Sequence, residues 1–175
     1  MKKILISGGK GFFARELQRQ NNDYDILGPS KKEMNVVEIK SLEKFIVSYK
    51  PNYFIHAGGL TRPMVIHEKE PEKSIENNII GTANVVLMCI KYNIKLIYLS
   101  TDYVYPGIDG NYNEEDYLKP FTNYGWSKLG GECSVRMHDN YLILRLAMNK
   151  RPFPHPKALV EMKKSLMYID EAVSV

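Results

Sequence analysis

The sequence has 175 residues, of which 44% are hydrophobic and 25% are charged, and its formal net charge is +4. This profile is typical of a single soluble globular domain and excludes a collagen, a disordered tail and a disulfide-stapled peptide. A chain of this length is expected to bury roughly 70% of the surface that its unfolded form exposes, so its core needs no metal or disulfide support.

No segment of the sequence indicates secretion, a membrane span or a nucleic-acid partner. The apolar run at residues 4–6 ends at Ser7, too early for a signal peptide, and no window approaches the 18 apolar residues of a transmembrane helix. Lysines and arginines are scattered along the chain and form no basic stripe. We therefore expect a cytoplasmic protein without membrane or nucleic-acid partners.

The cysteines and histidines lack the spacing of metal ligands. Cys89 and Cys133 form no CxxC or Cys/His pattern, which favours reduced thiols, and we expect Cys133 to be buried as a small hydrophobic residue. The four histidines, His56, His67, His138 and His155, show no HExxH-like spacing. The sequence therefore predicts no metal site, and His56 is expected to pack at the end of a strand.

Short apolar runs rich in β-forming residues alternate with longer segments of helical periodicity. This order predicts an α/β fold, a Rossmann-like doubly wound parallel sheet with helices on both faces. The expected strands lie at 3–7, 24–27, 34–37, 53–57, 95–100 and 141–145, and the expected helices at about 12–20, 42–49, 72–92 and 124–137. Ser41 is expected to cap the second helix.

Two segments do not follow this alternation. Residues 106–120 are rich in Gly, Asn, Asp and Pro and are too long for a simple connection, so we expect them to be functional. Residues 150–175 contain Pro152, Pro154 and Pro156 and continue the pattern poorly. The strands at 3–7, 53–57 and 95–100 end in small or polar residues, which predicts one crevice at their carboxyl ends, where open α/β sheets bind ligands.

A glycine-rich turn joins the first strand to the first helix. It reads Ser7-Gly8-Gly9-Lys10-Gly11-Phe12-Phe13-Ala14 and fits two dinucleotide-binding patterns, GxGxxA from Gly9 and GxxGxxA from Gly8. Glycines in this position let the backbone approach a pyrophosphate, and the amino end of the helix faces the anion. The alternative is a glycine-rich turn without a ligand.

The segment after the second strand bears on the choice between NAD and NADP. An Asp or Glu at this place accepts a hydrogen bond from the ribose 2′-hydroxyl of NAD. Here the chain has Ser30, Lys31 and Lys32, whose hydroxyl and two ammonium groups suit the 2′-phosphate of NADP. We expect NADP, with NAD as the alternative cofactor; a solvated pair of loop lysines is the simpler interpretation of Lys31 and Lys32.

The strongest strand ends in Ser100-Thr101-Asp102, and the next helix carries Tyr124 and Lys128 one turn apart. A phenol exchanges protons with a ketone or sugar hydroxyl near pH 7 when a nearby ammonium favours phenolate, so Lys128 would supply the charge and Thr101 a hydrogen bond. With 12 tyrosines in a lysine-rich chain, about one Tyr-x-x-x-Lys spacing is expected by chance. The position of the pair, after the glycine turn and the Ser-Thr strand end, favours a catalytic role.

Five segments together resemble the extended short-chain dehydrogenase/reductase family, in particular its nucleotide-sugar 4-ketoreductases, the dTDP-4-dehydrorhamnose reductases. The resemblance covers about residues 2–145, in the expected order. The segments are Ser7-Gly8-Gly9-Lys10-Gly11, His56-Ala57-Gly58-Gly59-Leu60-Thr61, Asn77-Asn78-Ile79-Ile80-Gly81-Thr82, Ser100-Thr101-Asp102-Tyr103-Val104-Tyr105 and Tyr124-Gly125-Trp126-Ser127-Lys128-Leu129.

The resemblance implies a role for each matching residue. Thr101, Tyr124 and Lys128 fall on the catalytic residues, with Tyr124 as the proton donor to a ketone that receives hydride from NADPH. The implied cofactor-binding residues are Gly8, Gly11, Phe12 and Phe13 at the pyrophosphate, Ala57, Gly58 and Gly59 beside the cofactor, Asn78 steadying the strand ends, and Asn35 at the adenine, besides Tyr124 and Lys128 themselves.

The same resemblance implies the domain organisation and the function. Residues 1–149 would form the NAD(P)-binding Rossmann domain, and residues 150–175 a remnant or the start of a substrate-binding region that is otherwise missing; Ser165–Val173 resembles that region's Asp-containing strand-to-helix segment. The expected function is NADPH-dependent reduction of a 4-keto nucleotide-sugar in deoxysugar or surface polysaccharide biosynthesis, with homodimerisation through helices 72–92 and 124–137. The alternatives are an epimerase of the same family and a catalytically silent dinucleotide-binding regulatory subunit.

Overall fold

The computed structural model describes residues 1–153 and 166–174. Expectations for His155, for Ser165 and for the prolines at 154 and 156 fall outside this part of the chain. None of the helices within it is long and apolar enough to cross a membrane.

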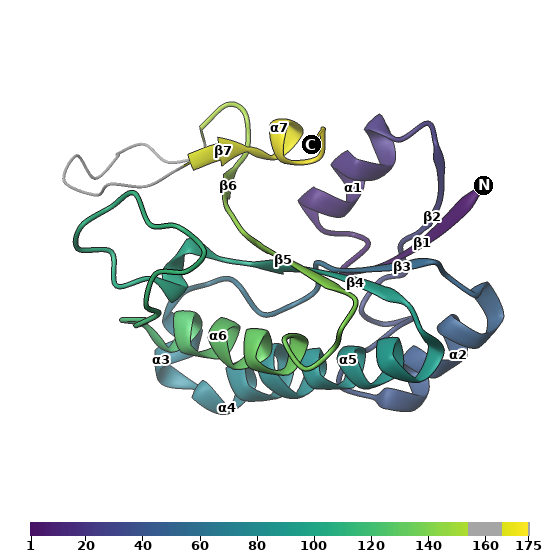
Figure 1. The fold of residues 1–175 in the computed structure, drawn as a ribbon, viewed down its shortest axis with the longest axis horizontal. Helices are drawn as coiled ribbons and strands as arrows, with labels where there is room; N and C mark the ends of the chain where they lie inside the picture. The colour runs from purple at the N-terminus through teal and green to yellow at the C-terminus, as the bar shows by residue number, and fades with distance from the viewer. Residues whose placement is uncertain (154–165, 175) are drawn as a thin grey trace.

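A five-stranded, wholly parallel sheet forms the centre of the molecule (Figure 1). Its order is β2-β1-β3-β4-β5, with β1 at Lys2–Ser7, β2 at Tyr24–Leu27, β3 at Tyr53–His56, β4 at Lys95–Ser100 and β5 at Tyr141–Arg145. The predicted Rossmann-like α/β fold is confirmed. The strand order reverses between β1 and β3, so their carboxyl ends lie at the position where open parallel sheets bind ligands.

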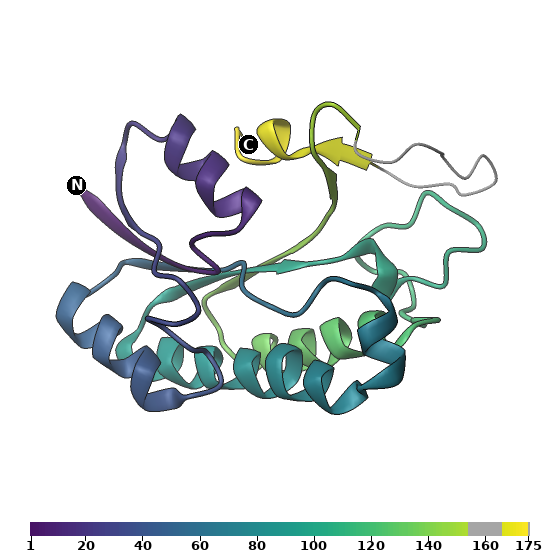
Figure 2. The same ribbon diagram turned by 180° about the vertical axis from the view of Figure 1, so that it is seen from behind.

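Helices cover the two faces of the sheet unequally (Figures 1 and 2). The helices α2 at Ile39–Tyr49, α5 at Gly81–Tyr92 and α6 at Asn123–Val135 lie on one face, and α1 at Phe12–Gln20 lies on the other. Between β3 and α5 the chain forms α3 at Val65–Lys69, α4 at Pro71–Ser74 and a π-helix at Ile75–Ile80. A 3-10 helix at Asp102–Val104 follows β4.

The carboxyl-terminal part forms a second, small sheet. Strands β6 at Ala147–Asn149 and β7 at Leu166–Tyr168 pair in parallel, and the short helix α7 at Ile169–Ala172 follows at once. Figure 1 shows α7 beside α1, and the Gln20 side chain donates to the Asp170 carbonyl at 3.1 Å. The strand-to-helix segment suggested by the family resemblance is therefore present.

Each face of the sheet has its own apolar core, because successive strand residues point to opposite faces. Leu5, Phe54 and Leu96 pack with the helices α2 and α5 in the larger core. Ile4, Ile6 and Ile55 pack against α1 in the smaller one. The alternation within β1 and β3 therefore supports helices on both sides of the strands that flank the crevice.

The expected strand at 34–37 is not formed. Met34 and Val36 are buried, as an apolar run suggests, but the segment is a series of turns in which the Met34 amide donates to the Ser30 carbonyl at 2.9 Å. The Asn84 side chain donates to the carbonyls of Val36 and Val37, at 3.1 and 2.9 Å. A side chain of α5 thus binds the backbone carbonyls that a neighbouring strand would bind in a sheet.

Three further expectations about helices need correction. Ser41 does not cap α2, which begins at Ile39; instead its hydroxyl accepts from the Asn35 amide at 3.1 Å. Helix 72–92 is helical throughout, but its middle is π-helical. Cys133 is exposed, because the face of α6 that meets the sheet carries Lys128 and Glu132 and leaves Cys133 on the opposite side.

Candidate active site

The glycine turn after β1 is packed too tightly for side chains. Gly8 has a φ of +71°, and the Gly11 amide donates to its carbonyl at 2.7 Å. A Cβ on Gly8 would lie 2.9 Å from Gly58 Cα, and one on Gly9 would lie 2.1 Å from the Gly28 carbonyl. The turn therefore needs glycine for its conformation and for the close approach of β2 and of the segment after β3.

The amino end of α1 is arranged to receive an anion. Gly11 has no side chain that could cap the helix, and the first turn carries no acidic residue. The first backbone amides of a helix lack partners within the helix and carry the positive end of its dipole. Phe12 and Phe13 supply such amides, so the turn has the features that a dinucleotide pyrophosphate requires.

The segment Ala57, Gly58 and Gly59 leaves β3 beside this turn. The Gly58 amide donates to the Ser7 hydroxyl at 3.0 Å. The Asn78 side chain then fixes the next residue, since its oxygen accepts from the Leu60 amide at 2.7 Å and its nitrogen donates to the Leu60 carbonyl at 2.9 Å. The same nitrogen donates to the Ser127 hydroxyl on α6 at 2.9 Å. Asn78 therefore ties the strand end to α6.

His56 is a buried connection beneath the crevice. Its Nδ1 lies 2.6 Å from the Ser7 hydroxyl and its Nε2 lies 3.0 Å from the Thr82 hydroxyl. Burial, followed by the nearby Lys128 ammonium, lowers the pKa of His56 to about 3, so the ring is neutral. Its predicted place at a strand end is confirmed.

Tyr124 lies in the first turn of α6, directly above the end of β4. The Thr122 hydroxyl accepts from the Gly125 amide at 3.0 Å and caps this helix. The Tyr124 ring lies between those of His67 and Tyr103, with centroid distances of 5.0 and 5.7 Å. Rings on both sides therefore fix the direction of the Tyr124 side chain.

Burial and hydrogen bonding act oppositely on the Tyr124 phenol. Burial raises its pKa to about 12, and a hydrogen bond with the Thr101 hydroxyl acts in the other direction. Thr101 is buried, and its hydroxyl also accepts from the Tyr103 amide at 3.3 Å. The phenol is therefore protonated at neutral pH, as a proton donor to a ketone must be.

Lys128 follows one turn later and is also buried. Its Nζ lies 4.1 Å from the centroid of the Tyr98 ring, a cation–π geometry. Burial lowers the pKa of Lys128 to about 7, and the charge of Glu132 opposes that change. The Tyr124 phenol is thus hydrogen-bonded to Thr101, and Lys128 lies one turn further along the same helix, with its Nζ against Tyr98 of β4.

The residues expected at the cofactor's adenosine half lie after β2. Lys32 is exposed, whereas Lys31 Nζ donates to the Asn77 side chain at 2.8 Å. A hydrogen bond from the Ser30 hydroxyl, followed by one from the Ser30 amide at 2.7 Å, lowers the pKa of the Glu33 carboxyl. The Asn35 oxygen accepts from the Val37 amide at 3.3 Å. Glu33 is an acid near the ribose-selecting position that the sequence analysis did not single out.

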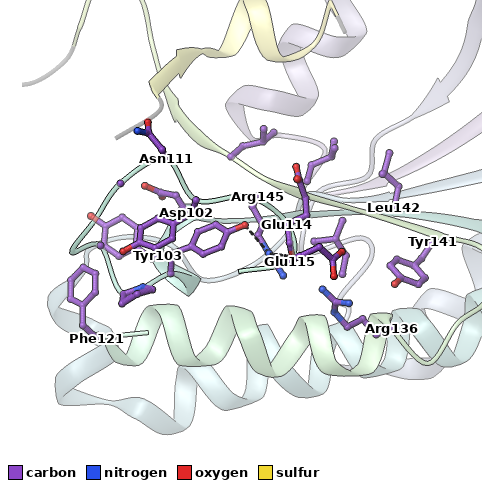
Figure 3. Close-up of a pocket in the computed structure, with 18 residues that line it drawn as sticks. Asp102, Tyr103, Asn111, Glu114, Glu115, Phe121, Arg136, Tyr141, Leu142 and Arg145 are labelled. Carbon is purple, nitrogen blue, oxygen red and sulfur yellow. Dashed lines mark hydrogen bonds between the residues drawn. The ribbon is translucent and has the colours of Figure 1, made fainter. Parts of the chain in front are cut away.

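A cavity of about 840 Å³ opens next to the 3-10 helix that follows β4; Asp102 and Tyr103 line it, whereas Thr101, Tyr124 and Lys128 do not. It runs from Tyr103 and Phe121 at one end to Arg136 and Tyr141 at the other, between the loop at 105–115 and β5 (Figure 3). Arg145 lines it and donates to the Tyr105 hydroxyl at 2.8 Å. The long loop singled out in the sequence thus forms a wall of this cavity.

Sequence reasoning missed the buried ion pair between Arg145 and Glu132, whose Nη2 and Oε2 atoms are 2.8 Å apart. Glu132 lies four residues after Lys128, as Lys128 lies four after Tyr124. This repeated spacing was the available signal, because residues four apart share a helix face.

The fold and the site together define the class of this protein. A parallel sheet of this order, a glycine turn after β1, and a Tyr-x-x-x-Lys pair on the helix after β4 place it among the Rossmann-like extended short-chain dehydrogenases/reductases. The chain belongs to the RmlD family, since the family model described as the RmlD substrate binding domain matches residues 1–149.

The chain is similar to curated proteins that include a subunit of an adenosyltransferase and a polysaccharide biosynthesis protein. The chain is similar to the methionine adenosyltransferase 2 subunit beta of Bos taurus, with 28% identity over 143 residues that cover 77% of this chain and 42% of the relative. It is also similar to the spore coat polysaccharide biosynthesis protein SpsK of Bacillus subtilis (strain 168), with 32% identity over 140 residues that cover 78% and 49%. The chain thus spans about half the length of the curated relatives it matches.

Solved structures agree with this assignment. The dTDP-4-dehydrorhamnose reductase of Bacillus anthracis str. Ames, in complex with NADP, is similar at a TM-score of 0.80 and 32% identity, covering 85% of this chain and 56% of that chain. The L-threonine dehydrogenase of Clostridium difficile matches 99% of this chain and 69% of its own at a TM-score of 0.82, but at 18% identity it supports the fold alone.

Proposed function

We propose that this protein reduces a 4-keto nucleotide-sugar with NADPH, with NAD(H) as the alternative cofactor, in deoxysugar or surface polysaccharide biosynthesis. The observation that carries this proposal is the arrangement of Thr101, Tyr124 and Lys128: the Thr101 hydroxyl is hydrogen-bonded to a protonated Tyr124 phenol, and the buried Lys128 lies one turn further along the same helix. Membership of the RmlD family and the likeness to an NADP-bound dTDP-4-dehydrorhamnose reductase support it. We place the reaction in the cytoplasm.

The residues present fit a dinucleotide. The turn at Gly8 and Gly11 would hold the pyrophosphate through the amides of Phe12 and Phe13. Ser30, Lys31 and Lys32 would meet the 2′-phosphate, Asn35 the adenine, and Ala57, Gly58, Gly59 and Asn78 the face of the cofactor nearest β3. When bound, the cofactor supplies the hydride.

Side chains of this protein would transfer the proton and bind the substrate oxygen. Tyr124 gives its phenolic proton to the ketone oxygen as carbon 4 accepts hydride, so that the ketone becomes an alcohol and the cofactor is oxidised. Thr101 donates a hydrogen bond to the same oxygen, and the Lys128 ammonium stabilises the negative charge that forms on Tyr124. The buried position of Thr101 and Lys128 strengthens both interactions.

The test is turnover of NADPH by the purified protein with a dTDP-linked 4-keto-6-deoxysugar. Tyr124→Phe removes the transferable proton while keeping the ring between His67 and Tyr103, so we expect a loss of at least about 100-fold in kcat. Tyr117→Phe, at an exposed tyrosine, is the control and should leave the rate unchanged. Full activity of Tyr124→Phe would contradict the proposal.

The outer helices carry exposed apolar side chains. Leu87 and Ile90 on α5 and Trp126 on α6 are all about half exposed. We propose a homodimer formed through these helices, which sedimentation equilibrium would show as twice the chain mass. In this arrangement residues 1–149 bind the dinucleotide, and residues 150–175 begin the substrate side.

A second candidate is a catalytically silent dinucleotide-binding subunit of another enzyme. The relatives named methionine adenosyltransferase 2 subunit beta favour it, since that name describes a subunit. Such a protein would bind NADPH without oxidising it in the presence of any keto-sugar. An epimerase, the remaining alternative, would be purified with NAD already bound and would show no net cofactor turnover.

A further inference from the structure

Arg145 connects the end of β5 to two other parts of the fold. Its side chain is only 8% exposed, and it binds Glu132 of α6 with Nε 3.1 Å from Oε1 and Nη2 2.8 Å from Oε2. On the other side its Nη1 donates to the Tyr105 hydroxyl at 2.8 Å and to the Glu114 carbonyl at 3.4 Å. The planar guanidinium has five donors in fixed positions, so it makes both sets of contacts at once.

Tyr105 joins Arg145 to the loop at 105–115. Its hydroxyl also donates to the Asn113 carbonyl at 2.9 Å, so one oxygen atom links the two ends of the loop. Its ring is stacked on that of Tyr112, with a centroid distance of 4.9 Å and an interplanar angle of 6°. The Tyr112 hydroxyl in turn accepts from two further loop amides, at 2.9 and 3.0 Å. The loop is therefore a compact unit that Arg145 fastens to β5 and α6.

The fastened loop forms one wall of the cavity of about 840 Å³, opposite β5 (Figure 3). Tyr103 belongs to the lining, and its ring lies 5.7 Å from that of Tyr124. The cavity therefore begins one side chain away from the phenol that would protonate a ketone. Its volume is in the range of small-molecule binding sites. A substrate whose ketone reaches Tyr124 has room here for the part that extends beyond the ketone.

We propose that Arg145 is a positioning residue for the substrate. Through Tyr105 it holds the loop at 105–115 in place, and the cavity between this loop and β5 receives the part of the substrate that extends beyond its ketone. The inference rests on the proposed function, because it places the substrate of that reaction. Without the bond to Tyr105 the cavity would be fully formed for only a fraction of the time, and the apparent affinity for the substrate would fall in proportion.

The first test breaks this connection without disturbing the buried ion pair. Tyr105→Phe removes the hydroxyl that binds Arg145 and Asn113 but keeps the ring that stacks on Tyr112. In the protein without ligand, hydrogen–deuterium exchange over residues 106–116 should become at least about fivefold faster. Tyr117→Phe, at an exposed tyrosine just beyond the loop, is the control and should leave the exchange unchanged. Unchanged exchange in Tyr105→Phe would overturn the inference.

Steady-state kinetics with the 4-keto nucleotide-sugar test the role of the cavity. In Tyr105→Phe the KM for the keto-sugar should rise about tenfold, while kcat stays within about twofold, because saturating substrate holds the loop in place. The Kd for NADPH should not change. A loss of stability alone would not separate KM from kcat in this way. An unchanged KM despite faster loop exchange, or an equal rise in Tyr117→Phe, would contradict the inference.

Arg145→Lys tests the arginine itself. Lysine keeps a cation for Glu132 but lacks the planar fork that reaches Tyr105 as well, so it should reproduce both the faster exchange and the rise in KM. Wild-type values of both would refute the inference. Should this variant not fold, because it alters a buried ion pair, Tyr105→Phe decides alone.

The two readouts also separate this inference from the proposed function. A wild type that reduces no keto-sugar would refute the proposed function. The exchange of the loop in Tyr105→Phe needs no substrate, so it would still decide whether Arg145 holds the loop in place.

Discussion

At the scale of single residues, burial acts in opposite directions on the two ionisable groups of the site. It raises the pKa of the Tyr124 phenol to about 12 and lowers that of the Lys128 ammonium to about 7. Both changes favour the uncharged form, because a region of low dielectric disfavours charge of either sign. At neutral pH the phenol therefore holds a proton to donate, and the charge of Lys128 depends on its surroundings.

His56 shows the same effect in a residue with a structural role, and it predicts a pH dependence of stability. Its pKa is about 3 in the folded protein, below the ordinary value of 6.5, so the unfolded chain binds more protons between these limits. Stability from this group is complete above pH 6.5 and is lost as the pH falls towards 3, by about 1.4 kcal/mol per pH unit.

Urea unfolding between pH 4 and pH 7 tests this dependence. Carboxylates also titrate in this range, so the informative quantity is the difference between the wild type and His56→Gln, which keeps a polar side chain that does not titrate. The free energy of unfolding should fall more steeply with decreasing pH in the wild type. Parallel curves would show that His56 is accessible to protons in the folded state.

At the scale of elements, α6 carries Tyr124 and Lys128 and packs on the sheet through glycine. A Cβ on Gly131 would lie 2.4 Å from the Tyr98 hydroxyl and 2.9 Å from the Asn78 carbonyl, neither of which can move aside easily. A Cβ on Gly130 would meet only the flexible end of Ile79. The two adjacent glycines therefore differ in how easily the structure could accommodate an added methyl group.

This difference gives a matched pair of variants. Gly131→Ala should lower the free energy of unfolding by about 1–3 kcal/mol, because the extra methyl forces the helix away from β4. Gly130→Ala should change it by less than about 1 kcal/mol, since the better helix propensity of alanine offsets the contact with Ile79. Equal effects in denaturant titrations would mean that α6 does not pack against β4 as closely as described.

The elements that could be predicted from the sequence are those whose pattern is local. The apolar runs of β1 and β4 and the glycine turn between β1 and α1 indicated two strands and the start of a helix, and these elements are present. The strand expected at 34–37 failed because Asn84, distant in the sequence, binds its carbonyls. The exposure of Cys133 likewise depends on which face of α6 meets the sheet.

The residues of the candidate site likewise include some that local sequence patterns indicated and some that they did not. Thr101, Tyr124 and Lys128 were singled out from strand-end and helix spacing; in the structure Thr101 is hydrogen-bonded to Tyr124, and Lys128 contacts the Tyr98 ring. Glu33 and the pair of Glu132 with Arg145 were missed, because their importance comes from partners that only the fold brings near. The periodicity of the sequence does not show that the Glu132 carboxylate is fully buried or that Arg145 binds it.

At the scale of the whole molecule, the chain combines a complete dinucleotide-type sheet with a short segment beyond it. The small sheet of β6 and β7 and the helix α7 lie on the α1 side, and the cavity beside β5 lies on the side of Tyr103 and Phe121 (Figures 1 and 3). We propose that binding of the cofactor depends only on the five-stranded sheet and its loops. It can therefore be measured independently of any substrate.

The preference for NADPH over NADH can be predicted for the five-stranded sheet and its loops, without reference to the segment beyond them. By calorimetric titration NADPH should bind at least tenfold more tightly than NADH, a difference of about 1.4 kcal/mol, because Lys31 and Lys32 meet the 2′-phosphate. Replacing both lysines by methionine should weaken NADPH binding and leave NADH binding unchanged, whereas Lys95→Met, at the amino end of β4, should affect neither. Equal affinities would instead assign the ribose to the carboxylate of Glu33, which lies beside Ser30, and would make NAD the cofactor.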